Sequence, residues 1–188
     1  MIDNPFSYGK TVDEPYFYGR KKELEEIKLS MRNATNLIIY PPRRIGKSSL
    51  VIKALKDLET ESHPTVYIDF FKVSSREKLI ELYAREVVRP LKNWTKGLQW
   101  IQGLIRGIQP AMGLDQAGLP ELRLSIDPMQ TTKAFEDIIN IPAKSKHEKC
   151  WIVVFDEFQE IEKLNGESFD RLPGKVVNLR CNAWLWQL

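Results

Sequence analysis

Cysteine, histidine and long apolar runs are scarce in this chain. Its two cysteines, Cys150 and Cys181, are too few among 188 residues for a disulfide scaffold. Its two histidines, His63 and His147, have no partner at metal-ligand spacing and are predicted to be surface loop residues. No apolar run approaches the length of a transmembrane helix. The N-terminus lacks the basic and apolar regions of a signal peptide. We therefore expect a cytoplasmic protein with no membrane contact.

The remaining composition is that of one globular domain. Hydrophobic residues make up 43% and charged residues 28%, which is typical of a chain that buries a core. The net charge of +3 permits nucleic-acid contact but does not argue for it, because no long basic cluster is visible. There is no internal repeat and no low-complexity segment.

Apolar periodicity predicts that helices and strands alternate along the chain. Helical spacing covers residues 20–31, 49–58, 94–108 and 128–140, and a further helix starts from a capping box at Ser74 and ends near Pro90. Strand patterns cover residues 37–40, 65–71 and 150–157, and residues 108–127 have the alternation of a β-hairpin. This order predicts an α/β fold with a parallel sheet and an inserted hairpin.

The most informative stretch leads from the strand at 37–40 into Gly46, Lys47, Ser48 and Ser49. This order is the context of a phosphate-binding P-loop. Gly46 permits the backbone angles that turn N–H groups towards a phosphate, and the two serines open a helix whose dipole favours an anion. Lys47 would reach the β/γ-phosphates and the Ser48 hydroxyl would ligate Mg²⁺. The alternative is a solvated basic turn between a strand and a helix.

Pro41 departs from the usual P-loop pattern because it stands where a glycine is expected. Proline has no N–H and a fixed φ angle. The N–H donors of a P-loop come from its later half, here residues 44–48, and none of these is lost. We interpret Pro41 as a variant rather than as a broken site.

A second set of candidate residues ends the strand at 150–157. Asp156 and Glu157 follow an apolar run, at the strand end where ligands bind in open α/β sheets. Asp156 would hold Mg²⁺ through water, and Glu157 would orient or activate the water that attacks the γ-phosphate. For an isolated Asp-Glu pair, simple solvation at a strand end is the better interpretation; the P-loop earlier in the chain reverses that preference and favours the functional interpretation.

Together these motifs resemble the archaeal-type ATPases, a branch of the STAND/AAA+ P-loop NTPases. Residues 42–50 are similar to the family form Pro-Arg-Arg-x-Gly-Lys-Thr-Ser-Leu, and residues 156–160 to its Walker B segment. Residues 4–24 resemble the segment that packs on adenine, and 67–69 match the family's second strand. The resemblance implies a three-layer sheet of the additional-strand type, ATP and Mg²⁺ as cofactors, and Lys47 and Glu157 as catalytic residues. The nucleotide contacts that it implies are Gly19, Arg20, Pro42, Arg43, Arg44, Ile45, Gly46, Lys47, Ser48 and Ser49.

The resemblance extends to residue 172, and residues 173–188 form an atypical tail. The core at 1–172 includes an adenine-side segment and helix at 1–35 and the hairpin at 108–127. In the family a sensor strand lies between the P-loop strand and the Walker B strand. We expect it to be missing through truncation or a frameshift, with only residues 176–179 as a makeshift replacement. Exposed strand edges would then make the chain marginally stable, self-associating and very slow in ATP hydrolysis.

Three functions follow from this pattern. The first is an ATPase core that binds Mg-ATP and, as in intact relatives, hydrolyses it to drive a conformational switch. The second is a truncated, non-catalytic nucleotide-binding remnant or interaction module. The third, a DNA-associated ATPase, would need an appended DNA-binding domain for which 188 residues leave no room. No particular protein or DNA partner can be predicted from the sequence.

Overall fold

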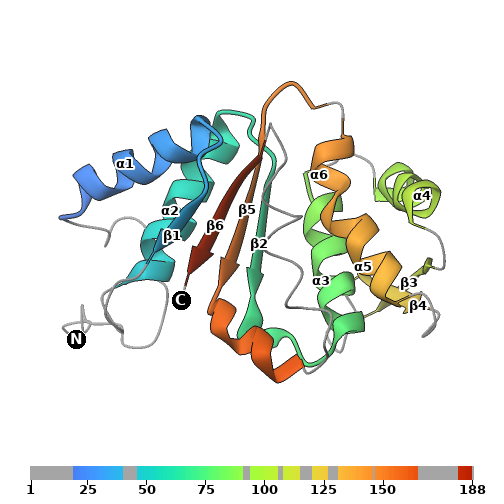
Figure 1. Ribbon diagram of the computed structural model, residues 1–188. Coiled ribbons are helices and arrows are strands. Elements are labelled where there is room, and N and C mark those ends of the chain that lie inside the picture. Colours follow the sequence, from blue (N-terminus) through green and yellow to red (C-terminus); the bar gives the residue numbers. More distant parts are fainter. Residues whose placement is uncertain are drawn as a thin grey trace, which may run out of the picture.

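The computed structural model describes residues 19–39, 46–90, 94–105, 108–114, 120–126, 131–145, 147–164 and 182–187. Over these ranges the chain forms a parallel sheet between two groups of helices (Figure 1). The elements are α1 (Lys21–Arg32), β1 (Leu37–Ile39), α2 (Lys47–Thr60), β2 (Thr65–Asp69), η1 (Phe70–Lys72), α3 (Arg76–Val88), α4 (Trp94–Leu104), β3 (Ile108–Leu114), β4 (Pro120–Ile126), α5 (Thr131–Ile139), α6 (Ile141–Lys144), β5 (Trp151–Asp156), η3 (Phe158–Leu164) and β6 (Asn182–Gln187). The prediction of a mixed α/β fold with a parallel sheet is confirmed.

The main sheet has four strands in the order β1-β6-β5-β2, all parallel. The last strand in the chain, β6, lies between β1 and β5, with Leu185 in register with both Leu37 and Val154. The expectation that β1 and β5 lack a bridging strand is therefore wrong. The bridging strand comes from residues 182–187, whereas the stretch at 176–179 lies outside the described residues. Both inner edges are paired because β6 hydrogen-bonds on each side.

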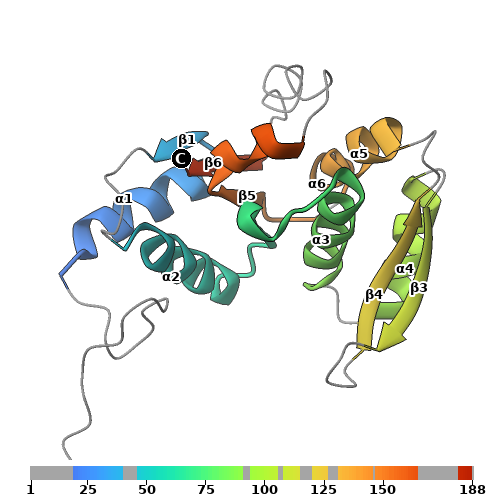
Figure 2. The ribbon, with the colours of Figure 1, turned by 90° about the horizontal axis from the view of Figure 1, so that it is seen from below.

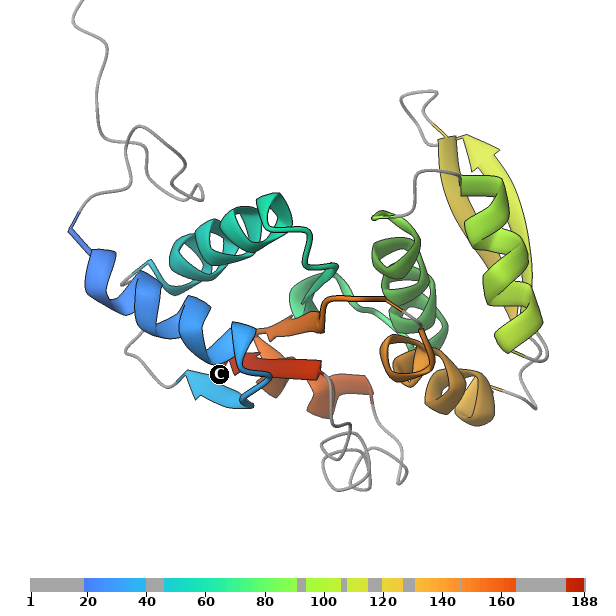
Figure 3. The ribbon, with the colours of Figure 1, turned by 90° about the horizontal axis from the view of Figure 1, so that it is seen from above.

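Side chains of β5 alternate between two separate cores. Ile152 and Val154 pack with buried residues of α1 and α2, such as Leu24 and Leu58. Trp151, Val153 and Phe155 pack instead with α3, α4, α5 and α6. All six residues of β5 are buried, as expected for a central parallel strand covered on both faces. Figure 2 and Figure 3 show α1 and α2 together, separated by the strands from α3, α5 and α6.

An antiparallel ribbon of β3 and β4 lies apart from the main sheet. In Figure 1 it lies with α4 beyond α3 and α5, on the side away from the strands. Ile101 and Ile105 of the α4 region are fully buried in the α3 core, which ties this unit to the rest of the domain. The helix predicted over 94–108 ends earlier, at Leu104, and β3 begins at Ile108.

The structure corrects the predicted boundaries of α3 and β2. Ser75, not Ser74, caps α3: its backbone is extended and its hydroxyl accepts the Lys78 N–H at 3.1 Å. The strand predicted over 65–71 ends at Asp69, whose carboxylate accepts the Phe71 N–H at 3.0 Å and so starts a 3₁₀ turn.

One prediction about the segments between the elements is wrong. His63 is not a surface residue: it is only 7% exposed, and its Nδ1 lies 3.1 Å from the Cys150 carbonyl oxygen, which gives the buried ring a polar partner. The helix predicted to end near residue 140 does end there, at Ile139, and Ile141 and Pro142 begin the separate short α6, whose first turn tolerates proline. The start of the preceding helix at residues 127–130 lies outside the described residues.

Candidate functional site

The start of α2 carries the described part of the predicted phosphate loop. Gly46 precedes the helix with φ of +74°, a left-handed conformation that a glycine adopts at low cost. Lys47 and Ser48 are half-buried, Ser49 is buried, and the first turn contains no acidic residue. Backbone N–H groups and a lysine therefore lie together in a helix turn that has no acidic residue of its own, a setting that favours an anion. Pro42, Arg43, Arg44 and Ile45, also predicted as contacts, lie outside the described residues.

The carboxyl end of β5 carries Asp156, which is 3% exposed. Its Oδ1 accepts the Glu157 N–H at 2.9 Å, and its Oδ2 accepts the Tyr67 hydroxyl at 2.5 Å. Tyr67 lies on β2, which pairs with β5 so that Asp69 is in register with Asp156. Both oxygens of this buried carboxylate thus have donors, which is how a protein holds a buried charge.

Tyr67 connects the two ends of the candidate site. Its hydroxyl donates to Asp156, and the Ser48 hydroxyl hydrogen-bonds with the same phenolic oxygen. Burial and the neighbouring Asp156 carboxylate raise the pKa of Tyr67 far above its usual range, so the phenol stays protonated and remains a donor. The helix that follows the predicted P-loop and the acidic end of β5 therefore meet at one oxygen atom, on the α2 face of the sheet.

Glu157 follows in a turn with a strained backbone. Its φ is +53°, a left-handed value that is rare for residues other than glycine. Its side chain is half-buried, and Oε2 accepts a hydrogen bond from Gln159 Nε2 at 2.5 Å. The other amide atom, Gln159 Oε1, is buried without a hydrogen-bond partner among the described residues. The turn thus fixes the Glu157 carboxylate beside Asp156.

The residues at this site fit a magnesium ion. No group of three or more His, Cys, Asp or Glu side chains that could hold a metal occurs in the described ranges. Mg²⁺ is commonly held by one or two protein oxygens together with phosphate and water, rather than by an all-protein cage. The Ser48 hydroxyl and the Asp156 carboxylate are hard oxygen donors of this kind, and both contact the Tyr67 oxygen.

Two other predicted contacts lie at the start of α1. Gly19 is exposed with φ of +89°, and Arg20 is the residue before the helix. The Arg20 guanidinium donates to Glu23, with Nε to Oε1 at 3.1 Å. This contact holds the Arg20 guanidinium along the first turn of α1.

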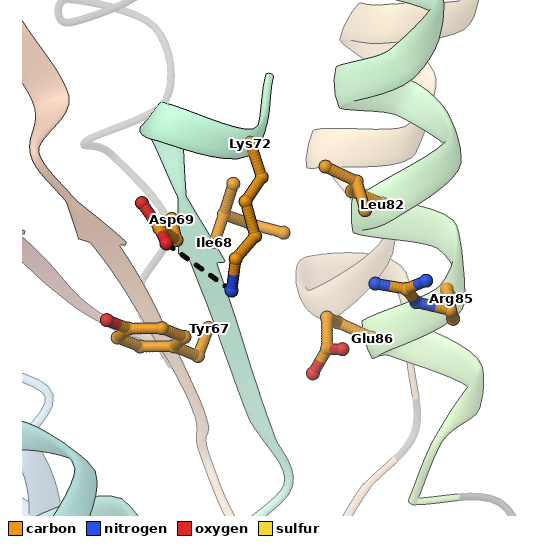
Figure 4. Close-up of a pocket in the computed structure, with 7 residues that line it drawn as sticks. All are labelled: Tyr67, Ile68, Asp69, Lys72, Leu82, Arg85 and Glu86. Carbon is orange, nitrogen blue, oxygen red and sulfur yellow. Dashed lines mark ion pairs between the residues drawn. The ribbon is translucent and has the colours of Figure 1, made fainter. Parts of the chain in front are cut away.

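A small pocket of about 140 Å³ opens between β2 and α3 (Figure 4). Lys72 pairs with Asp69 at 3.4 Å across its rim, and Arg85 and Glu86 line it from α3. Figure 4 shows the Tyr67 hydroxyl directed away from α3, so the pocket and the hydroxyl lie on different sides of β2. Its volume is below the roughly 300 Å³ at which ligand pockets usually begin. At this volume the pocket is too small to enclose a nucleotide.

Sequence reasoning missed Tyr67 and Gln159 as site residues. The strand pattern at 65–69 does place Tyr67 and Asp69 on one face, but it does not say which face meets α2. Gln159 stands two residues after Glu157, and only the turn geometry brings its amide to that carboxylate.

The fold and these two ends define a P-loop NTPase-like α/β domain: a parallel sheet with a Gly-Lys-Ser helix start beside a buried strand that ends in an acid. The profile of a family described as an ATPase domain predominantly from Archaea matches residues 17–172, and the chain belongs to this family. A stretch of 147 residues is 26% identical to the tRNA modification GTPase MnmE of Mycoplasmopsis pulmonis (strain UAB CTIP), covering 78% of this chain and 30% of that protein. The chain thus spans less than a third of that relative. Both matches support a relationship to P-loop NTPases and indicate nucleotide binding or hydrolysis.

Among the described residues, no helix is both long enough and apolar enough to cross a bilayer.

Proposed function

We propose that this chain binds Mg-ATP at the start of α2 and hydrolyses it. One observation carries the proposal. Ser48 of the predicted P-loop and Asp156 at the carboxyl end of β5 both hydrogen-bond with the Tyr67 hydroxyl. Ser48 and Asp156 are 108 residues apart in the sequence, and the fold brings both to the same tyrosine side chain. Membership of an ATPase family supports the same function.

Each residue at the site has a separate role in this proposal. Lys47 contacts the β/γ-phosphates together with the N–H groups of the α2 start. Ser48 and Asp156 hold Mg²⁺, which neutralises charge on the phosphates when bound. Glu157 orients the attacking water, and Gln159 holds its carboxylate through the hydrogen bond at 2.5 Å. Hydrolysis would then relax the loop-helix contacts and drive a conformational switch.

The base of the nucleotide is a separate question. The adenine-side segment at residues 1–18 lies outside the described residues, so ATP rests on the family resemblance. A GTPase among the relatives makes GTP the second candidate. Competition of unlabelled ATP and GTP against one fluorescent ATP analogue separates the two: we expect ATP to displace the analogue at the lower concentration. Equal or better displacement by GTP would reassign the base.

The charge at Lys47 provides the main test of binding. Lys47→Ala should lower the affinity for a fluorescent ATP analogue by about 100-fold, because a charge-assisted hydrogen bond to phosphate contributes about 1.5–3 kcal/mol. Lys56→Ala is the matched control, since it removes the same charge from an exposed position on the same helix. Equal affinities for the two variants would contradict the P-loop assignment.

A further inference from the structure

The position of Tyr67 in the candidate site indicates a specific role for its hydroxyl group. Its ring packs against the α1/α2 core, which includes Leu50, Val51 and Val154, so the phenol is held from behind. Its oxygen contacts both residues that we propose as magnesium ligands, Ser48 and Asp156. This inference rests on the proposed function, because it concerns the same metal site.

We propose that the Tyr67 hydroxyl is a latch that closes the magnesium site of the nucleotide-free protein and must leave Asp156 and Ser48 before the metal binds. The carboxylate of Asp156 is 3% exposed and already accepts two hydrogen bonds, one on each oxygen. A bound Mg²⁺, or a water that it carries, would need the Asp156 carboxylate, and the Tyr67 hydroxyl already donates to Oδ2 of that carboxylate. Metal and phenol therefore compete for Oδ2.

Competition is one of two arrangements that a tyrosine next to a metal ligand can adopt. In the other, the tyrosine stays in place as an outer partner that orients the carboxylate and strengthens metal binding. Such a partner needs a contact with Asp156 only. Tyr67 also hydrogen-bonds with Ser48, so its oxygen contacts both proposed ligands and not Asp156 alone. This position favours the latch.

The two arrangements predict opposite effects of removing the hydroxyl. Hydrogen bonds to a carboxylate are among the stronger ones, and this one stabilises the metal-free state. An interaction made in only one of two states shifts the balance between them. Tyr67→Phe keeps the ring and removes the hydroxyl, so the latch predicts tighter Mg²⁺ binding, whereas an orienting partner predicts weaker binding.

The experiment is a Mg²⁺ titration at a fixed, sub-saturating concentration of a fluorescent ATP analogue. For Tyr67→Phe we expect the half-saturating Mg²⁺ concentration to fall about tenfold, equivalent to ~1.4 kcal/mol, with little change in binding of the analogue without Mg²⁺. Tyr83→Phe is the matched control, because Tyr83 is also buried and its hydroxyl donates to the Ile139 carbonyl oxygen, at 3.5 Å, on the other face of the sheet. Its half-saturating concentration should match the parent's.

The other outcomes overturn the proposal. A higher half-saturating concentration would make Tyr67 an orienting partner, and an unchanged one would make its hydrogen bonds irrelevant to the metal. Tyr67→Leu, which keeps an apolar side chain in the core, provides a second variant if Tyr67→Phe fails to fold. If the folded parent binds no nucleotide, the proposed function fails, and thermal unfolding with and without Mg²⁺ then tests the latch alone. A larger Mg²⁺-induced rise in the melting temperature of Tyr67→Phe would support the latch; an equal or smaller rise would overturn it.

Discussion

The two faces of the sheet differ sharply at the carboxyl ends of β2 and β5. On the α2 face, Tyr67 and Asp156 form a polar group with Ser48. On the α3 face, at the same level, Phe70, Phe155 and Phe158 form an aromatic cluster with ring centroids 5.3 to 6.0 Å apart. The Phe70–Phe155 and Phe70–Phe158 pairs are edge-to-face, and pairs of this kind add about 0.5–1.5 kcal/mol beyond the area that they bury.

This difference has its origin in the alternation of a single strand. Phe155 and Asp156 are adjacent, so their side chains point to opposite faces. Glu157, with its strained backbone, lies between Asp156 and Phe158 in the chain. The aromatic cluster therefore anchors the turn from behind, where a rigid scaffold can hold a strained functional residue. We expect the aromatic face to determine stability and the polar face to determine binding.

The largest effect should come from the aromatic face. Phe155→Ala removes a ring that is 3% exposed and should lower the free energy of unfolding by about 3–5 kcal/mol. Urea denaturation followed by circular dichroism measures the loss. Phe71→Ala serves as the control, because Phe71 is 65% exposed and its removal should change stability by less than about 0.5 kcal/mol. Equal losses would show that the cluster does not act as an anchor.

Glu157→Gln should separate chemistry from binding on the polar face. The amide keeps the size of the side chain but is a poor base, so we expect turnover to fall about 100-fold while nucleotide affinity stays within twofold. Single-turnover release of phosphate from Mg-ATP measures the first quantity and fluorescent titration the second. Unchanged turnover would remove Glu157 from the proposed mechanism. A parent that binds but releases no phosphate would instead fit a non-catalytic nucleotide-binding protein.

Asp156→Asn should weaken the binding of Mg²⁺ more than it lowers the stability of the fold. The amide oxygen can still accept the Glu157 N–H, but the negative charge that attracts Mg²⁺ is lost. We expect the Mg²⁺-dependent part of nucleotide affinity to fall about tenfold and the free energy of unfolding to change by less than that of Phe155→Ala. Titrations with Mg²⁺ and with EDTA measure the first effect. If Asp156→Asn lowered the stability as much as Phe155→Ala, the polar face would contribute to stability as strongly as the aromatic face, and the proposed difference between the two faces would be wrong.

Local patterns were enough to predict most of this architecture. The apolar runs at 37–40 and 150–157 and the helical spacing at 20–31 and 49–58 correspond to β1, β5, α1 and α2. These segments have strong periodicity and clear boundaries, so neighbouring residues alone decide their structure. The acid at the end of β5 was predictable for the same reason, because an apolar strand ending in Asp156 has few interpretations.

Features that depend on distant pairing could not be predicted. β6 lies at the centre of the sheet because it pairs with both β1 and β5. The sequence of residues 182–187 alone does not indicate this position. Tyr67 became a site residue only once the α2 face of β2 was known. The choice between Ser74 and Ser75 as the α3 cap was equally open, since both are good capping residues and only the backbone conformation decides.

The smallest effect is expected where ion pairs link α1 to α2, on the α2 side of the sheet. Lys28 is buried and its Nζ lies 3.1 Å from Asp57, which Lys53 also contacts at 2.8 Å. Lys28→Met keeps most of the apolar stem and leaves Asp57 with Lys53, so the loss at pH 7 should be about 0.5–1 kcal/mol. Urea denaturation measures it.

The pH dependence tests whether that loss comes from the ion pair. Burial raises the pKa of Asp57, but hydrogen bonds from Lys53 and Lys28 lower it by more. The pKa of Asp57 in the folded protein therefore lies below its ordinary value of 3.8. A carboxyl with a depressed folded pKa contributes stability above its unfolded pKa and loses it as the pH falls through the folded one. The stability difference between the parent and Lys28→Met should therefore shrink below about pH 4. Lys22→Met, on an exposed side chain of the same helix, should show little difference at either pH. A Lys28→Met difference that persists at low pH would mean that the stem's packing, and not its charge, joins the two helices.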